Sequence, residues 1–278
     1  MNSKTYKIFD IHTHIYPDAV AQKAIDSLSV FYDFERIYHF LPSGKGTFED
    51  LRDSCVKYNV CGCLMLCVAT NPKHMEHVND FMAETVAKNT TEGFTPIGFA
   101  GIHQDHPEIV KEAERAASIG LKGIKIHPDI QRVNIDDVRL MALYEAIEGK
   151  MPLYLHMGDP REEFRFSSTE RLVKIKKRFP NLEVVAAHLG GYTAWDKIGL
   201  LTDFDKIWFD ASSSLWVIDS KYAKNIITEL GTKRVMFGTD YPVAYANEEL
   251  ERFMQVELDE ETRADILYNN AARFLGLQ

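Results

Sequence analysis

The feature that most constrains the fold is a regular alternation, in which a short apolar run is followed by a helical pattern eight times along the chain. The runs expected to form strands are 7–12, 60–68, 94–101, 121–127, 152–156, 183–188, 206–211 and 234–240. Strands that alternate with helices predict a parallel sheet, and eight such units predict an α/β fold closed into a (β/α)8 TIM barrel. An extra helix over 260–275 is expected after the last unit.

One segment interrupts this alternation between the first two strands. Residues 30–46 are rich in aromatic side chains and end in Pro42–Ser43–Gly44. We expect an inserted loop or lid there, within a single barrel domain that spans residues 1–278. A doubly wound open sheet is the alternative, but the Gly-rich turn that usually follows its first strand is absent.

The composition narrows the class of protein. The chain is 45% hydrophobic and 26% charged, as is typical of a soluble globular protein. Its most apolar stretch, 61–69, is far shorter than the about 20 residues that a bilayer requires, and the polar start Met1–Lys7 predicts no secretory signal, so we expect a cytoplasmic location. A net charge of −9 argues against nucleic acid or an anionic membrane as partner.

Reactive side chains gather where the predicted strands end. They are His12 and His14 on the first strand, Lys125 and His127 on the fourth, His156 on the fifth, His188 on the sixth and Asp240 on the eighth. The carboxyl ends of the strands form the active site of such a barrel. Half of the ten histidines are therefore expected at one mouth.

The spacing within the first strand suggests a metal site. Side chains alternate along a strand, so Asp10, His12 and His14 should share one face. The eighth strand closes against the first, which sets Asp240 beside this pair, while the fifth and sixth strands face it across the mouth. Three imidazoles and one carboxylate from this set could converge on one Zn²⁺ or a similar ion.

Several motifs in this chain occur together in one known family. They are Asp10-Ile-His12-Thr-His14, Lys125-Ile-His127-Pro128, Leu155-His156, Ala187-His188-Leu189-Gly190-Gly191, Gly238-Thr239-Asp240-Tyr241-Pro242 and the ending Asn270-Ala-Ala-Arg-Phe-Leu-Gly-Leu277. With these motifs the chain resembles the amidohydrolase superfamily, specifically the amidohydrolase-2 group that includes aminocarboxymuconate-semialdehyde decarboxylase. The resemblance covers essentially the whole chain.

The resemblance implies a set of metal ligands. By it, His12, His14, His156 and Asp240 bind one divalent ion, with Zn²⁺ as first choice, and His188 assists catalysis. We expect Asp240 to serve also as a general base. Asp10 is expected either to contact the metal ligand His12 without binding the metal itself, or to be a buried carboxylate that accepts hydrogen bonds from the backbone.

The fourth strand is expected to bind the substrate. Lys125 and His127 share a face, so we expect them to bind a carboxylate or phenolate of an anionic small molecule. The alternative is a carboxylated Lys125 that bridges a second metal ion. Arg161, after the fifth strand, is either a further anion ligand or a solvated arginine. The sequence also allows the protein to form a homodimer.

Two activities fit this site. The first is hydrolysis of an ester, lactone or amide by a metal-activated water. The second is non-oxidative decarboxylation of a small aromatic or unsaturated acid. The metal ligands are the same for both, and the short chain and the Lys-x-His-Pro motif favour the hydrolase. A barrel that only binds a ligand would leave these site residues without a use.

Overall fold

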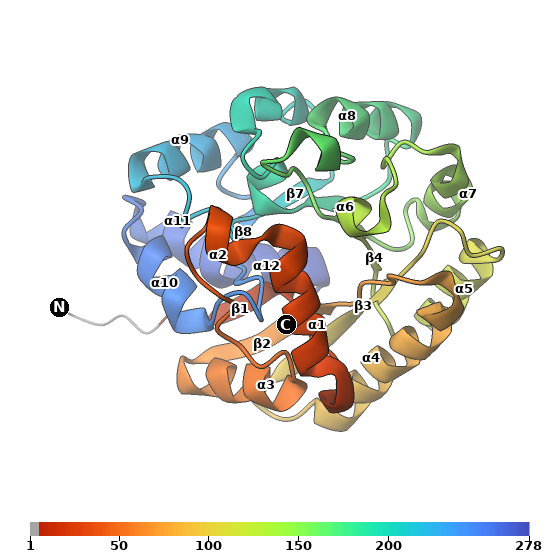
Figure 1. The fold of residues 1–278 in the computed structure, drawn as a ribbon. Helices are drawn as coiled ribbons and strands as arrows, with labels where there is room; N and C mark the ends of the chain where they lie inside the picture. Colours follow the sequence, from red (N-terminus) through yellow and green to blue (C-terminus); the bar gives the residue numbers. More distant parts are fainter. Residues whose placement is uncertain (1–5, 278) are drawn as a thin grey trace.

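The computed structural model describes residues 6–277 and contains eight parallel strands that pair in sequence order (Figure 1). The strands are β1 Ile8–Thr13, β2 Val60–Leu66, β3 Thr95–Gly101, β4 Ile124–Ile126, β5 Leu153–Leu155, β6 Val184–Ala186, β7 Ile207–Asp210 and β8 Val235–Met236. A parallel bridge between Thr13 and Tyr241 and a hydrogen bond from the Ile11 N–H to the Phe237 carbonyl, 2.9 Å long, join the last strand segment to the first. The predicted (β/α)8 TIM barrel is confirmed. Met1–Thr5, most of the polar start, lie outside the described residues.

Helices surround the strands, as the view in Figure 1 shows. They are α1 Asp18–Tyr32, α2 Phe34–Ile37, α3 Phe48–Lys57, α4 Met75–Asn89, α5 Ile109–Ser118, α6 Pro128–Gln131, α7 Val138–Ile147, α8 Thr169–Arg178, α9 Ser220–Leu230, α10 Ala246–Met254, α11 Glu260–Ala264 and α12 Asn270–Leu275. A π-helical turn joins α11 to α12, so the predicted extra helix is present. Among residues 6–277, no helix combines the length and the apolar character needed to cross a membrane.

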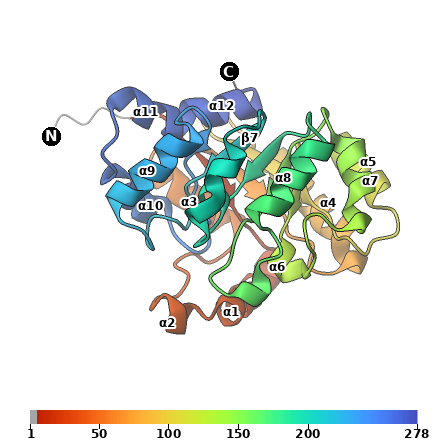
Figure 2. The same cartoon turned by 90° about the horizontal axis from the view of Figure 1, so that it is seen from above.

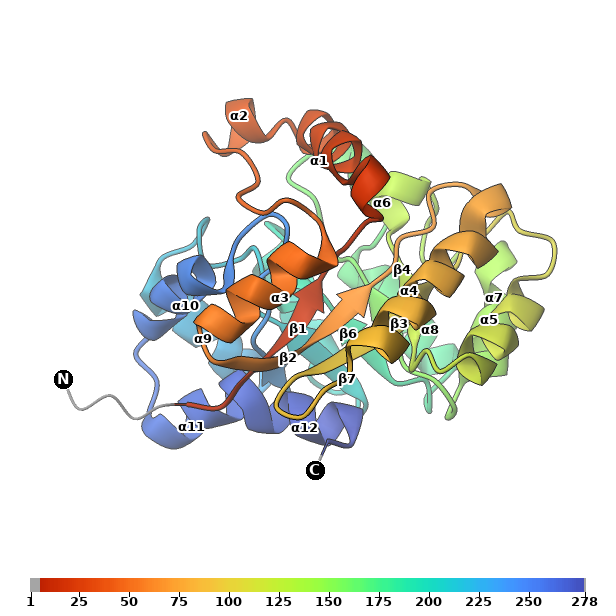
Figure 3. The ribbon, with the colours of Figure 1, turned by 90° about the horizontal axis from the view of Figure 1, so that it is seen from below.

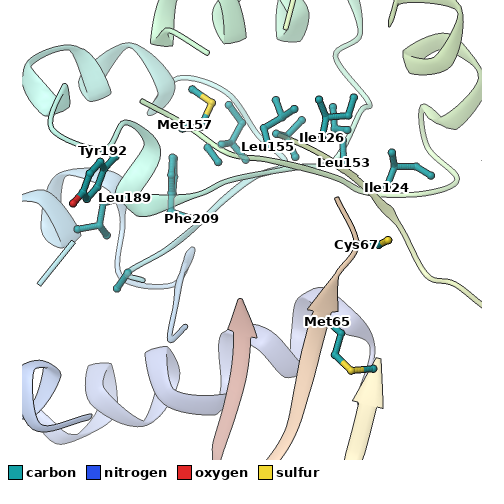
Figure 4. Packing of buried hydrophobic residues seen from close by; sticks show 14 of the residues in the cluster. Met65, Cys67, Ile124, Ile126, Leu153, Leu155, Met157, Leu189, Tyr192 and Phe209 are labelled. Atoms are coloured by element: carbon teal, nitrogen blue, oxygen red, sulfur yellow. The ribbon is translucent and has the colours of Figure 1, made fainter. Parts of the chain in front are cut away.

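Alternation along the strands separates an apolar outer face from a partly polar interior. Ile124 and Ile126 of β4 pair with Leu153 and Leu155 of β5, and Figure 4 shows these four side chains together in the buried cluster. Each fully buried aliphatic side chain of this kind contributes about 1.5–3 kcal/mol to folding. Lys125, between the two isoleucines, points to the opposite face, into the barrel, where its Nζ lies over the Tyr154 ring.

Several strands end earlier than the sequence predicts, because the chain leaves the ladder where the polar residues begin. The predicted strand 121–127 is only Ile124–Ile126, since the His127 N–H donates to Gln131 Oε1 at 2.8 Å. The predicted strand 234–240 is only Val235–Met236, since the Phe237 N–H donates to the Ile266 carbonyl at 2.8 Å.

The inserted segment between β1 and β2 lies over one end of the barrel. Figures 2 and 3 both show α1 and α2 at the end opposite to α11 and α12. The segment is more helical than predicted, since α1 continues to Tyr32 and α2 follows at once. Asp33 ends α1 because it adopts a left-handed conformation, with φ 52° and ψ 48°.

Candidate metal centre and active site

Three side chains at the seam between β8 and β1 bring one ligand atom each to a common point. The Nε2 atoms of His12 and His14 lie 3.2 Å apart, and each lies 3.4 Å from Asp240 Oδ1. Bonds of 2.0–2.2 Å in a tetrahedral zinc site place neighbouring ligand atoms about 3.3 Å apart. The residues present therefore fit one divalent ion in both ligand type and spacing.

The remaining polar atom of each of these side chains is already engaged. His12 Nδ1 lies 3.2 Å from the Asp210 carboxylate, and His14 Nδ1 lies 2.8 Å from a backbone carbonyl of β2. Asp240 Oδ2 accepts a hydrogen bond of 2.6 Å from Ser213. This arrangement leaves both Nε2 atoms and Oδ1 free, and such supporting contacts fix the orientation of metal ligands. Burial lowers the pKa of His12 to about 3, so its imidazole is neutral at neutral pH, as a ligand must be.

Asp10 does not join this group. Its carboxylate accepts hydrogen bonds from the Thr239 N–H at 3.0 Å, the Thr239 hydroxyl at 2.7 Å and the His12 N–H at 3.2 Å. The register of β1 against β2 is irregular between Asp10 and Thr13. The predicted common face therefore holds for His12 and His14 but not for Asp10, which instead ties β1 to the loop after β8.

The backbone at the site is unusual at three positions. A Cβ on Gly238 would lie only 2.9 Å from the His12 Cβ, so glycine allows the loop to approach β1. His188 and Asp240 have positive φ angles, 57° and 59°. Such conformations in residues other than glycine cluster at functional sites.

His188 and His156 form a chain of contacts beside the seam. His188 Nδ1 lies 3.0 Å from the Ser212 carbonyl and its Nε2 lies 3.0 Å from His156 Nδ1. His156 Nε2 in turn lies 3.0 Å from Asp129 Oδ2. Both ring nitrogens of His156 thus have close partners outside the group formed by His12, His14 and Asp240. The role of His156 as a fourth ligand stays a prediction.

The end of β4 contains buried polar atoms that lack partners. Lys125 is 1% exposed, its Nζ lies 4.8 Å from the centre of the Tyr154 ring, and no residue from 6 to 277 forms a hydrogen bond with it. Burial lowers its pKa to about 8. His127 Nε2 lies 2.9 Å from the Tyr32 hydroxyl, while its Nδ1 has no partner in the same range. Asp129 is fully buried, and its Oδ2 lies 3.0 Å from His156 Nε2.

Two other groups of described residues have the composition of a metal site but not its geometry. In the group of His12, His188 and Asp210, the carboxylate already accepts hydrogen bonds from Tyr154 at 2.7 Å and from the Ser212 N–H at 2.9 Å. In the group of His127, Asp129 and His156, the two imidazoles are stacked at 4.1 Å with planes 15° apart. Lone pairs that lie in nearly parallel planes cannot both point at one ion. The group at the seam is therefore the best candidate metal centre.

A cavity of about 910 Å³ opens above this centre. His14, His127, His156, His188 and Asp240 line its inner part, and Tyr32, Phe34, Tyr38, Tyr192 and Trp216 form aromatic walls. Lys125 lies behind this surface rather than on it, so the structure brings His127 but not Lys125 to the cavity. Their assignment to substrate binding stays a prediction.

Two functional candidates were not predicted from the sequence. Asp210 had an available signal, because it is the next-to-last residue of the predicted strand 206–211 and so lies near the carboxyl end of that strand, as Asp240 does in the eighth. Tyr32 had none, because its contact with His127 joins residues far apart in the chain. Arg161, predicted as an anion ligand or a solvated side chain, is neither: it pairs with Asp159 through two contacts of 2.8 Å and packs under the inserted segment.

The family follows from a comparison with known sequences. The family model described as Amidohydrolase matches residues 10–277. The chain belongs to the amidohydrolase-2 family. This match confirms the resemblance that the sequence motifs indicate, and the chain is an enzyme of this family.

Three proteins that this chain is similar to are decarboxylases. A 2-amino-3-carboxymuconate-6-semialdehyde decarboxylase of Dictyostelium discoideum is 24% identical over 242 residues, which is 73% of this chain and 66%, just under two thirds, of that protein. The structure of 5-carboxyvanillate decarboxylase from Sphingomonas paucimobilis is 18% identical with a TM-score of 0.70, covering 98% of this chain and 100% of that one. Dihydroxybenzoic acid decarboxylase from Polaromonas sp. JS666, with bound manganese and the inhibitor 2-nitroresorcinol, is 16% identical with a TM-score of 0.73, covering 98% and 97%. At these identities the two structures establish a shared fold.

Proposed function

We propose that this protein is a metal-dependent, non-oxidative decarboxylase of a small aromatic or unsaturated carboxylic acid. The sequence alone favours hydrolysis, with decarboxylation as the alternative. The named relatives support the alternative, since the curated relative and both solved structures described above are decarboxylases.

The observation that carries the proposal is the shape of the cavity above the metal centre. Its inner end holds the ligand group, and its walls are the aromatic side chains Phe34, Tyr38, Tyr192 and Trp216. Aromatic walls favour a flat, apolar ring, and a site of this size can bury a small acid completely. Such a ring would direct its carboxylate toward the seam between β8 and β1.

His12, His14 and Asp240 would hold the ion, with His156 as the predicted fourth ligand. Zn²⁺ is the first choice, and Mn²⁺, bound in the similar Polaromonas enzyme, is the second. A bound divalent ion supplies a Lewis acid that neutralises anionic substrate oxygens and stabilises negative charge as it develops.

The side chains around the cavity would carry the proton. In decarboxylation the bond between the ring carbon and the carboxylate breaks, its electron pair stays on the ring carbon, a proton joins that carbon and CO₂ leaves. The proton comes from solvent, and Asp240, which lines the cavity at the metal centre, is placed to relay it to the ring carbon. His188, which also lines the cavity, would orient the substrate, and the inserted segment would exclude water.

The test offers metal-loaded protein a panel of hydroxybenzoates, unsaturated dicarboxylic acids, lactones and esters. We expect ¹³CO₂ from an acid labelled in its carboxylate, detected by mass spectrometry. In D₂O, one deuterium should appear on the carbon that lost CO₂. The His12→Ala variant serves as the control. Acid release from a lactone or ester, with no CO₂ from any acid, would show the proposal to be wrong and would support the hydrolase.

A further inference from the structure

The cavity above the metal centre continues beyond its aromatic walls, between α1 and the start of α4. In Figure 3, α1 lies above the carboxyl end of β1. We call this part of the cavity the outer lobe, and its lining is aliphatic: Val20, Ala24, Leu28, Val68, Val78 and Ile130. Sites for small ligands measure about 300–1,000 Å³. With about 910 Å³, the whole cavity therefore has room for much more than a single ring.

The wall that α1 contributes is an apolar face that the barrel leaves uncovered. Val20, Ala24 and Leu28 follow one another at intervals of four residues, so they lie on one side of the helix. Val20 is exposed, and Ala24 and Leu28 are half-buried. Val78 of α4 and Ile130 of α6, also half-buried, line the same lobe. A ligand with an aliphatic chain would cover these side chains, and each methylene group that it buries strengthens binding about fourfold.

The ionisable side chains along the cavity complement negative charge at both of its ends. The chain has a net charge of −9, yet Asp240 at the metal centre is the only carboxylate among the described residues that line the cavity. The outer lobe instead has Lys23, His74 and His77 among its polar lining residues. All three are exposed, and the side chain of His74 makes no capping hydrogen bond to α4. These groups are therefore available to bind an anion.

Each of the two helices that border the outer lobe has a hydrogen-bond donor next to its apolar residues. On α1, Lys23 lies one turn after Val20 and next to Ala24. Before α4, His74 precedes Val78 by four residues, so the two side chains lie on one side of that segment. Donors from both sides thus border the same apolar surface. The ligand group that fits this arrangement is an aliphatic chain with an anionic end.

We propose that the outer lobe binds an aliphatic extension of the acid substrate that ends in an anionic group. Lys23, His74 and His77 bind this end, while the carboxylate that is lost lies at the metal centre. The inference rests on the proposed function for the second of these placements. It adds the substrate class: a ring or unsaturated acid whose aliphatic side chain carries a second carboxylate. A substrate of this length would occupy both parts of the cavity.

The experiment measures binding without turnover, so that it does not depend on which reaction occurs. Zn²⁺-loaded protein is titrated by calorimetry with benzoate and with benzoates that carry a pentyl, a 4-carboxybutyl or a neutral 4-carbamoylbutyl chain at ring position 3 or 4. For one ring position, we expect the pentyl compound to bind about tenfold more tightly than benzoate. The carboxylate chain should bind about fivefold more tightly than its amide, a modest factor because water screens the exposed donors.

Two variants test where the chain lies. Ala24→Phe fills the outer lobe and should reduce the gain from the pentyl chain to within about twofold. Lys23→Gln should reduce the preference for the carboxylate over the amide to within about twofold. Lys221→Gln, which changes an equally exposed lysine of α9, should keep this preference. Because position 23 is exposed, Lys23→Gln decides the case if Ala24→Phe does not fold.

The proposal is overturned if no chain improves binding, if the carboxylate and the amide bind equally, or if Ala24→Phe keeps the full gain from the pentyl chain. These results differ from a failure of the proposed function. CO₂ release from a hydroxybenzoate, without any gain from a chain, would reject the role of the outer lobe alone. Absence of CO₂ together with an intact preference for the carboxylate chain would reject the decarboxylase alone.

Discussion

Two regions next to the cavity, the seam between β8 and β1 and the end of β4, differ in how completely their buried polar atoms are paired. On the seam side, His12, His14 and Asp240 each have one atom bound to a supporting group and one atom free at the common point. On the β4 side, Lys125 and His127 Nδ1 are buried without any partner among residues 6–277. The arrangement on the seam side fits an ion of fixed position, whereas the β4 side has buried polar atoms without hydrogen-bond partners among the described residues.

The difference has an energetic meaning. A buried polar atom without a hydrogen bond costs about 1–3 kcal/mol, so the β4 side lowers the stability of the protein. Residues that are kept at such a cost commonly serve binding or catalysis. The seam side, in contrast, should lose function without a gain in stability when it is altered. The following predictions test this contrast.

The largest effect is expected from His14→Ala on the seam side. Loss of one of the three ligands should remove most of the metal and reduce activity by about 10³-fold or more. Metal content by mass spectrometry and CO₂ release check this, with His39→Asn as control, because His39 is exposed and asparagine tolerates its left-handed backbone. Full metal content in His14→Ala would disprove the assignment of the metal centre.

Asp210→Asn should weaken the same side less. The amide keeps the size of the side chain but no longer offers His12 a charged acceptor, so metal affinity should fall about 10- to 100-fold. Competition with a chromophoric chelator measures this affinity. Asp205→Asn, an exposed acid just before β7, should have no effect. Equal affinity in the two variants would mean that Asp210 does not support His12.

Lys125→Met tests the β4 side and should separate function from stability. Burial lowers the pKa of Lys125 from 10.5 to about 8, so folding below pH 8 confines a charge that the unfolded chain keeps in water. We expect the variant to lose about tenfold or more in kcat/KM. Its free energy of unfolding at pH 7, measured by denaturant titration, should nevertheless be about 3 kcal/mol higher than that of the wild type.

The sign of the pH dependence follows from the same shift. The folded protein releases the proton of Lys125 at lower pH than the unfolded chain, so the cost disappears as pH rises from 8 to 10.5. The stability advantage of Lys125→Met over wild type should therefore shrink across this range. Lys122→Met, an exposed neighbour, gives the baseline. A constant difference between pH 7 and 10.5 would contradict the predicted burial of charge.

Ser213→Ala should give the smallest change. It removes only the 2.6 Å hydrogen bond to Asp240 Oδ2, so metal affinity should fall about threefold to tenfold. The chelator assay detects this difference, and the unfolding free energy of the metal-free protein should stay nearly constant. A loss as large as that of His14→Ala would mean that Ser213 does more than hold Asp240.

The sequence predicts the positions of the site residues better than their contacts. His12, His14, His188 and Asp240 could be found because parallel strands of a barrel present their carboxyl ends on one face. Asp210 stands in an equivalent place, but its role is visible only through its contact with His12. Nothing in a linear pattern shows which buried atoms remain unpaired, since that depends on the register of neighbouring strands.

Other parts of the site lie outside any periodic pattern. Tyr32 is the last residue of α1, because Asp33 adopts a left-handed conformation and ends the helix there. Asp129 belongs to the short helix α6 after β4 rather than to a strand. The choice between hydrolysis and decarboxylation is equally hidden, because the same ligand set serves both. Strand lengths were overestimated at β4 and β8, where side-chain and helix contacts replace the ladder.

The place of the metal centre in the chain has a consequence for biosynthesis. His12 and His14 precede β2 to β7 in the chain, whereas Asp240, their partner across the seam, follows them and is therefore made later. A nascent or truncated chain therefore cannot assemble this group of ligands. Capture of the ion is expected only after Asp240 has been made, and it would join the first and last strands of the barrel wall once the intervening units have folded.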